Sequence, residues 1–139
     1  LKSLYAEEST DAAIAFEAQV IEITHLMTSG GVLDPDHGLI NFVVSQSGRC
    51  YRLDLELAQI VMNHRWHSDL YGRMIGTLVG SHCLVVQPNV LISSDFARRL
   101  ADRLQPSKRA LRRATVRVHE ILEVQRSKYA IDTNVKLPW

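Results

Sequence analysis

Apolar side chains recur every three or four residues near the start of the chain, which favours a helix over residues 10–28. Ser9 or Thr10 can cap the beginning of this helix, and Gly30-Gly31 supplies a stop at its end. One apolar stripe contains Ala13, Phe16, Val20, Ile23 and Met27. We therefore expect a helix that packs this stripe on the core.

The spacing then changes to the period of two that is typical of strands. Residues 39–45 are apolar and rich in β-branched side chains, and residues 46–49 can form a turn. In the next segment, residues 50–55, apolar positions alternate with polar ones: Tyr51, Leu53 and Leu55 with Arg52 and Asp54. This pattern predicts a β-hairpin.

The middle of the chain predicts one more helix and one more hairpin. Residues 56–67 return to helical spacing, and a helix here would cover one face of the first hairpin. Residues 74–79 and 83–87 predict a second hairpin with a turn at Gly80-Ser81. Glycine recurs every four residues, a spacing that on a helix would make a close-packing face: Gly72, Gly76 and Gly80. The β-branched neighbours and the turn favour strands instead.

Two helices are expected in the last third of the chain. Ser94 can cap the first, over residues 95–104, and Ser107 can cap the second after Gln105-Pro106. The apolar stripe of the second helix consists of Leu111, Ala114, Val118, Ile121 and Leu122. Residues 130–139 lack periodicity and predict an extended tail that Trp139 can pin.

The resulting order of elements, α-ββ-α-ββ-α-α, predicts an α+β fold. We expect a small antiparallel sheet from two hairpins, with helices packed on one face. The length of 139 residues and the apolar fraction of 46% fit one globular domain. We place this domain at residues 1–129, with a basic helical segment at 95–129 and the tail at 130–139.

Composition adds expectations about the environment of the chain. No apolar run reaches the length of a membrane span, so no membrane partner is expected. Cys50 and Cys83 lie in apolar runs, and a pair of buried thiols in a reducing compartment is favoured over a disulfide. This predicts a cytoplasmic location. The chain begins at Leu1 without a methionine, which is compatible with a segment of a longer protein.

The net charge of +1 conceals an asymmetry along the chain. Residues 1–94 hold five basic and ten acidic residues, whereas residues 95–139 hold eleven basic and five acidic, so the two parts carry about −5 and +6. Such segregation indicates an anionic partner for the basic part, or docking of basic on acidic surfaces within the chain or between copies.

A local resemblance adds shape to the charge argument. The segment LADRLQPSKRALRRA, residues 100–114, resembles the helix-turn-helix of bacterial transcription regulators. In that family a small residue, here Ala101, lets the second helix cross the first closely, a serine such as Ser107 opens the second helix, and an apolar residue such as Leu111 anchors it. Two departures are Gln105-Pro106 in place of the usual turn glycine and the lack of a predicted helix just before the pair. The resemblance implies a DNA-facing set: Ser107, Lys108, Arg109, Arg112 and Arg113.

The basic helix also indicates binding of nucleic acid or another polyanion without this motif. Arg109, Arg113 and Arg117 recur at every fourth position beside Lys108 and Arg112, and such side chains contact phosphates. The predicted nucleic-acid-binding set is therefore Ser107, Lys108, Arg109, Arg112, Arg113 and Arg117. The alternative is a solvated face, or one docked on an acidic surface made by Glu7, Glu8, Asp11, Glu17 and Glu22.

Two weaker candidate sites involve aromatic and imidazole side chains. An interface patch is proposed from residue types that dominate interaction hot spots: Arg65, Trp66, Tyr71 and Arg73. His64, His67 and His82 are candidate zinc ligands, but the spacings that make a zinc site specific are absent.

Enzyme motifs are missing from the sequence. No G-x-S-x-G elbow, G-x-G-x-x-G or P-loop pattern is present, so we expect no catalytic residues and no cofactor. The first hypothesis is a nucleic-acid-binding module, with DNA regulation as a specific form. The second is a protein-interaction or assembly subunit, including a homo-oligomer, that uses acidic and basic surfaces. The third is a zinc-dependent enzyme.

Overall fold

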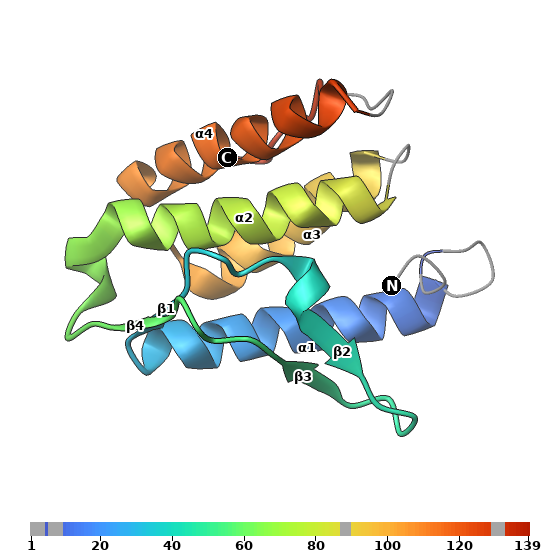
Figure 1. The fold of residues 1–139 in the computed structure, drawn as a ribbon, viewed down its shortest axis with the longest axis horizontal. Helices are drawn as coiled ribbons and strands as arrows, with labels where there is room; N and C mark the ends of the chain where they lie inside the picture. Colours follow the sequence, from blue (N-terminus) through green and yellow to red (C-terminus); the bar gives the residue numbers. More distant parts are fainter. Residues whose placement is uncertain (1–4, 6–9, 87–89, 129–132) are drawn as a thin grey trace.

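The computed structural model describes residue 5 and residues 10–86, 90–128 and 133–139. These residues form four α-helices and two small antiparallel sheets, which confirms the expected α+β class. The helices are α1 (Thr10–Ser29), α2 (Ser68–Val86), α3 (Val90–Leu104) and α4 (Lys108–Arg126). In Figure 1 the strands and the short helix η2 (Leu39–Asn41) lie across α1 and α2, and α3 lies behind them.

Three expected helices are confirmed. α1 covers the predicted residues 10–28, and Ala13, Phe16 and Val20 of its apolar stripe are buried. Gly31, just after its end, has a φ of 79°, a conformation that glycine adopts without strain. α3 and α4 match the two helices predicted near the end of the chain, although α3 begins five residues before Asp95.

The predicted second hairpin is wrong, because residues 68–86 form the single helix α2. α2 lies at the centre of the fold and contacts α4, α3, η2 and the strand β1 (Val32–Leu33). Because neighbouring elements cover much of its surface, twelve of its nineteen residues are buried and no continuous polar face interrupts its apolar sequence. A short apolar run of this kind cannot be assigned to helix or strand by periodicity alone.

The glycine repeat forms a close-packing face of α2, the arrangement that was expected only if this segment were a helix. A Cβ on Gly76 would lie 2.6 Å from the carbonyl oxygen of Ala114, and a Cβ on Gly72 would overlap the carbonyl oxygen of Ala110. Gly80 lies against the side chain of Ile121. The order of these contacts shows that α2 and α4 run in the same direction, with their backbones in close contact (Figure 1).

The first predicted hairpin is confirmed. Strand β2 (Phe42–Val44) pairs antiparallel with β3 (Cys50–Arg52), with Phe42 opposite Arg52 and Val43 opposite Tyr51. Gly48 occupies the turn with a φ of 78°, which again suits glycine. Cys50 in β3 and Cys83 in α2 are free thiols.

The predicted helix over residues 56–67 is wrong. This segment contains the strand β4 (Gln59–Ile60), which pairs antiparallel with β1, and the short helix η3 (His64–His67). The apolar residues that suggested a helix do not share a buried face, since Leu57 and Ile60 are 57% and 88% exposed.

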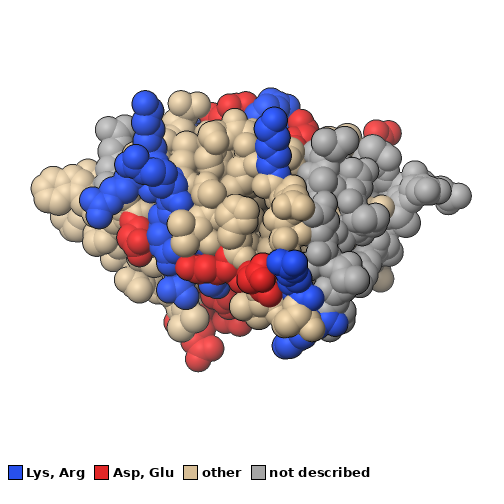
Figure 2. Space-filling view, turned by 90° about the horizontal axis from the view of Figure 1, so that it is seen from above, with Lys and Arg blue, Asp and Glu red and all other residues tan. Residues whose placement is uncertain are grey.

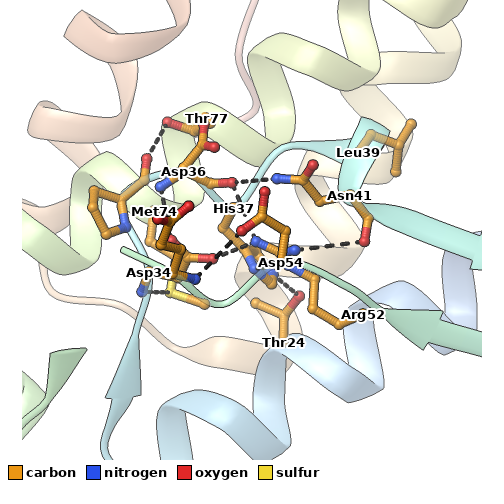
Figure 3. A network of polar contacts seen from close by, with 12 residues as sticks. Thr24, Asp34, Asp36, His37, Leu39, Asn41, Arg52, Asp54, Met74 and Thr77 are labelled. Carbon is orange, nitrogen blue, oxygen red and sulfur yellow. Dashed lines mark hydrogen bonds and ion pairs between the residues drawn. The ribbon is translucent and has the colours of Figure 1, made fainter. Parts of the chain in front are cut away.

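Arg52 points from the hairpin into the protein and joins a buried polar network, drawn in Figure 3. Its guanidinium pairs with the carboxylate of Asp34, and its Nε–H donates to Nδ1 of His37 over 3.2 Å. The other ring nitrogen of His37 lies 2.8 Å from the hydroxyl oxygen of Thr24 on α1. Burial, with the nearby charge of Arg52, lowers the pKa of His37 to about 3. The network therefore attaches the hairpin to the helices through a neutral histidine.

A second buried network joins three helices. His82 of α2 lies 2.7 Å from the carboxylate of Glu17 on α1 and 2.8 Å from the hydroxyl of Ser93 on α3. Arg99 pairs with the other carboxylate oxygen of Glu17. Burial lowers the pKa of His82 more than the hydrogen bond to Glu17 raises it, so the imidazole is neutral in this network. Ring stacking of His82 on Phe96 completes the contact.

The last described residues, 133–139, contain neither helix nor strand and cross α3 and α4. Val135 is buried, and Ser94 donates to the backbone carbonyl of Lys136. The indole N–H of Trp139 donates to the hydroxyl of Thr115 over 3.0 Å, so Trp139 attaches the end of the chain to α4.

Candidate anion-binding surface

The parallel packing of α2 and α4 brings the first turns of both helices to the same end of the molecule. The hydroxyl of Ser107 caps α4 by accepting a hydrogen bond from the backbone N–H of Ala110. Its oxygen lies 3.5 Å from the hydroxyl oxygen of Ser68, the first residue of α2. The positive ends of two helix dipoles therefore lie side by side.

Three exposed cations follow the cap of α4. Lys108, Arg109 and Arg112 are exposed and make no ion pair with any residue that the structure describes. Arg73, in the second turn of α2, is also exposed and without a described ion-pair partner. Figure 2 shows Lys and Arg side chains gathered at this end of the molecule. We call Lys108, Arg109 and Arg112 the basic triplet.

Arg113 and Arg117, which were expected to contact nucleic acid, are already paired. Arg113 lies 3.1 Å from the carboxylate of Asp69, and both arginines contact Glu120 at 3.1–3.2 Å. Arg117 also donates to the hydroxyl of Thr77 over 3.1 Å. Each arginine side chain is only 24% exposed, because it packs along α2. Two members of the predicted cationic set are therefore paired within the chain, whereas Lys108, Arg109 and Arg112 remain exposed.

Arginines of α3 pair with acidic residues of α1, so part of the charge asymmetry along the chain is neutralised within the fold. Arg99 pairs with Glu17 and with Asp95, and Arg103 lies 3.1 Å from the carboxylate of Glu22. Docking on an acidic surface that includes Glu17 and Glu22 was the alternative expected for the basic helix α4, but arginines of α3 pair with these two carboxylates instead. Glu7 and Glu8, from the same expected acidic surface, lie outside the described residues.

A hollow of about 450 Å³ lies beside the basic triplet. It is lined by hydroxyl and imidazole side chains from the end of α1 and the starts of α2 and α4, including His25, Ser29, His64, Ser68 and Ser107. Tyr71, which is 3% exposed, also lines the hollow, and burial raises the pKa of its phenol to about 12. No carboxylate is among the residues that line this hollow.

The helix-turn-helix resemblance holds for the local elements and fails for their packing. Gln105 has a φ of 48°, the left-handed conformation for which glycine is usual at this turn. However, α4 packs on α2, and Ala101 and Leu111 line an open hollow of about 250 Å³ together with Trp139. The close crossing that Ala101 was expected to permit is absent.

The other predicted sites are not assembled. His82 is buried beside Glu17, whereas His67 is exposed and His64 stacks edge-on against Tyr71. Within the described ranges, no group of three or more His, Cys, Asp or Glu residues could hold a metal ion. The expected interface patch is also divided: Trp66 and Arg73 are exposed, Tyr71 is 3% exposed, and the side chain of Arg65 lies outside the described part.

Comparison with known proteins gives no family for this chain. No protein-family model, curated protein or solved structure matches it. None of the described helices is both long and apolar enough to cross a membrane. Functional inference therefore rests on the arrangement of the chain's own side chains.

Two features of the structure were not predicted from the sequence. The triad-like set of Ser93, His82 and Glu17 comes from three helices far apart in sequence, and each side chain is at most 2% exposed, which makes it a structural network. The second feature is the outward orientation of Tyr51 and Leu53. The alternation in β3 was visible in the sequence, but it did not reveal which face points to solvent.

Proposed function

We propose that this chain binds nucleic acid through phosphate groups at the end where α2 and α4 begin. The observation that carries the proposal is the contrast between the basic triplet and its neighbours. Between residues 98 and 126, six arginines each pair with a carboxylate: Arg98, Arg99, Arg103, Arg113, Arg117 and Arg126. In the same segment, only the basic triplet has no ion pair with a described residue.

The position of the triplet disfavours a purely structural role. Cations at the first turn of a helix oppose the helix dipole, and each costs roughly 0.3–1 kcal/mol at an exposed site. Lys108, Arg109 and Arg112 occupy the first five residues of α4, where Asp or Glu would stabilise the helix. An anionic ligand reverses the sign of this interaction, because its charge meets both the cations and the helix end.

Phosphate contacts by such a surface are expected to be independent of base sequence. Because α4 packs along α2 instead of standing clear of it, the docking of a recognition helix in the major groove has no support from this fold. Lys and Arg side chains with a helix N-terminus are the usual partners of the backbone phosphates, which position a nucleic acid without reading it. The hydroxyls of Ser68 and Ser107 line the hollow beside the triplet.

The test is a salt-titrated binding assay with mixed-sequence duplex and single-stranded oligonucleotides. Three phosphate contacts predict a log–log salt slope of about −2.7 on duplex DNA and about −2.1 on single strands. The variant K108Q/R109Q/R112Q should remove most of the binding and bring the slope towards zero. Because the substitutions relieve an unfavourable charge at the start of α4, the variant should stay folded.

A matched control removes the same charge elsewhere. The variant R126Q/K128Q/K136Q loses three exposed cations from the other end of α4 and from the end of the chain. If phosphate binding is local, this control keeps the wild-type affinity and slope. Equal losses in both variants would indicate attraction by net charge alone, and binding without salt dependence would refute the proposal.

A further inference from the structure

The two tryptophans of the chain lie in contrasting environments. Trp139 packs against the core, and its indole N–H donates to the hydroxyl of Thr115. Trp66, in η3, is 86% exposed and is the most exposed of the described phenylalanine, tyrosine and tryptophan side chains. No described side chain stacks on its ring. An aromatic surface on the order of 200 Å² is therefore left in contact with solvent.

Trp66 lies at the end of the molecule that carries the basic triplet. It precedes Ser68 by two residues, which span at most about 7 Å of chain. The hydroxyl oxygen of Ser68 lies 3.5 Å from that of Ser107, and the triplet begins at the next residue. In Figure 1 the green segment before α2 and the first turn of α4 lie at the same end. The exposed ring and the triplet are therefore neighbours on one surface.

The charges around Trp66 favour an anionic ligand. Asp69, the first carboxylate after Trp66, is paired with Arg113 of α4 over 3.1 Å. Arg73 follows Asp69 by one helical turn, so it lies on the side of α2 that meets α4. Because Arg73 is exposed and has no described ion-pair partner, it adds a fourth cation to the triplet.

An exposed aromatic ring beside phosphate contacts is the arrangement with which proteins hold single-stranded nucleic acid. Cations follow the backbone phosphates, and a base stacks its flat face on the aromatic side chain. Inside a duplex the neighbouring bases cover both faces of each base, so only an unpaired base is free to stack on Trp66. Every base has such a face, and stacking therefore shares the independence of sequence expected for the phosphate contacts.

A lipid surface also presents phosphates, but this end of the molecule suits it less well. Helices that lie on a membrane bury an apolar face at the boundary of the acyl chains. The helix that carries the triplet instead buries its apolar stripe within the fold, where Ala110 and Ala114 meet the glycines of α2. An unpaired base is therefore the better match for Trp66.

We propose that Trp66 is the stacking platform for an unpaired base of a nucleic acid whose phosphates contact the basic triplet and Arg73. This inference rests on the proposed phosphate binding and narrows its ligand to single-stranded DNA or RNA. Phosphate contacts release counterions and set the salt slope, whereas stacking of an uncharged base does not. The ring and the cations therefore make contributions that can be measured separately.

The first test compares single strands with duplexes of the same length over a range of salt concentrations. Trp66→Leu keeps an apolar side chain but removes the aromatic face, so single strands should bind roughly 5- to 150-fold more weakly at every salt concentration, with an unchanged slope. Duplex binding should equal that of the wild type. Trp66→Tyr keeps a flat ring and should retain most of the affinity for single strands.

Matched controls separate stacking from other effects of the substitution. Tyr51→Leu removes an exposed ring from the hairpin, which lies on the opposite side of α2 from α4 in Figure 1, and should bind as the wild type does. Inorganic polyphosphate has phosphates but no bases, so Trp66→Leu should bind it as tightly as the wild type. An equal loss for single strands and polyphosphate, or a dependence on Trp66 seen only with phosphatidylserine vesicles, overturns the inference.

The second test observes the indole directly. Trp139→Phe leaves Trp66 as the remaining tryptophan, and titration with DNA or RNA single strands should quench its fluorescence. Trp66→Phe retains Trp139 and should show little quenching. Emission of Trp139→Phe that neither kind of strand alters overturns the inference.

Failure of this inference differs from failure of the proposed function. If Trp66→Leu holds single strands as tightly as the wild type while K108Q/R109Q/R112Q loses them, stacking is refuted and the phosphate surface stands. If the wild-type chain binds neither strands nor duplexes, both proposals are refuted.

Discussion

Apolar and small residues are concentrated in two regions of this molecule, and the chain covers only one of them. Along the α2–α4 contact, Gly72 and Gly76 let the two backbones meet, and twelve of the nineteen residues of α2 are buried. On the outward side of the β2–β3 hairpin, Tyr51 and Leu53 stay half exposed although the side chain of Arg52, between them, is buried. An apolar stripe thus shows which side chains share a face, but not whether the same chain covers that face.

The two regions differ because a buried carboxylate beneath the hairpin needs a charged partner. The carboxylate of Asp34 is 1% exposed and needs a charged partner, which Arg52 of the hairpin provides. Turning the strand over would bury Tyr51 and Leu53 but leave that carboxylate unpaired, at a cost of several kcal/mol. A buried charge therefore sets the orientation of the hairpin and leaves its apolar side facing solvent.

The largest expected effect comes from removing the inward-facing charge. Arg52→Met keeps much of the side-chain volume but leaves Asp34 and the acceptor nitrogen of His37 without their partner. We expect a loss of about 3–5 kcal/mol in the free energy of unfolding, measured by urea denaturation of dilute protein. Arg49→Met, three residues earlier and exposed, should change it by less than about 0.5 kcal/mol. Equal effects at the two positions would contradict the role given to the buried pair.

The next effect tests the closed contact between α2 and α4. Gly76→Ala places a Cβ 2.6 Å from the carbonyl oxygen of Ala114 and should destabilise the protein by about 2–3 kcal/mol. At Gly80 the added Cβ meets only the side chain of Ile121, which can move. Gly80→Ala should be nearly neutral, since helix propensity offsets up to about 1 kcal/mol of strain. Thermal unfolding of the two variants gives this difference directly, and a more stable Gly76→Ala would refute the close contact.

These two regions also show how far the sequence could lead. The stripe of α1, the turn at Gly48 and the cap at Ser107 are local signals, and the structure confirms the elements they predict. The assignment of α2 failed because burial on all sides erases the periodicity that separates helix from strand. The cationic face was overestimated because the partners of Arg113 and Arg117 include Asp69, forty-four residues before Arg113. Such long-range contacts cannot be deduced from the spacing of charges.

A smaller effect should appear as a pH dependence of stability. The folded-state pKa of His37 is about 3, below the ordinary value of 6.5, because the ring is buried and faces Arg52, Thr24 and Phe42. The unfolded chain therefore binds a proton as the pH falls through 6.5 while the folded chain does not, and stability decreases. The loss should reach about 2 kcal/mol between about pH 8 and about pH 5, above the range in which carboxylates titrate.

Two histidine variants separate this contribution from the rest. His37→Gln removes the buried titrating group, so its stability should fall less steeply with pH, from a lower starting value at about pH 8. His82 contributes in the same direction, since its pKa is also lowered by burial, and some slope will remain. His119→Gln, on the exposed side of α4, should keep the full slope. An unchanged slope in His37→Gln would show that the ring does not stay neutral in the folded protein.

The smallest effect is expected on the outward side of the hairpin. Tyr51→Thr should alter the free energy of unfolding by less than about 0.5 kcal/mol, because the ring, 48% exposed, already contacts solvent and threonine suits a strand. Urea denaturation of dilute protein checks this value. A loss as large as that of Gly76→Ala would mean that the ring belongs to the core and that the exposed side of the hairpin contributes to stability as the buried side does.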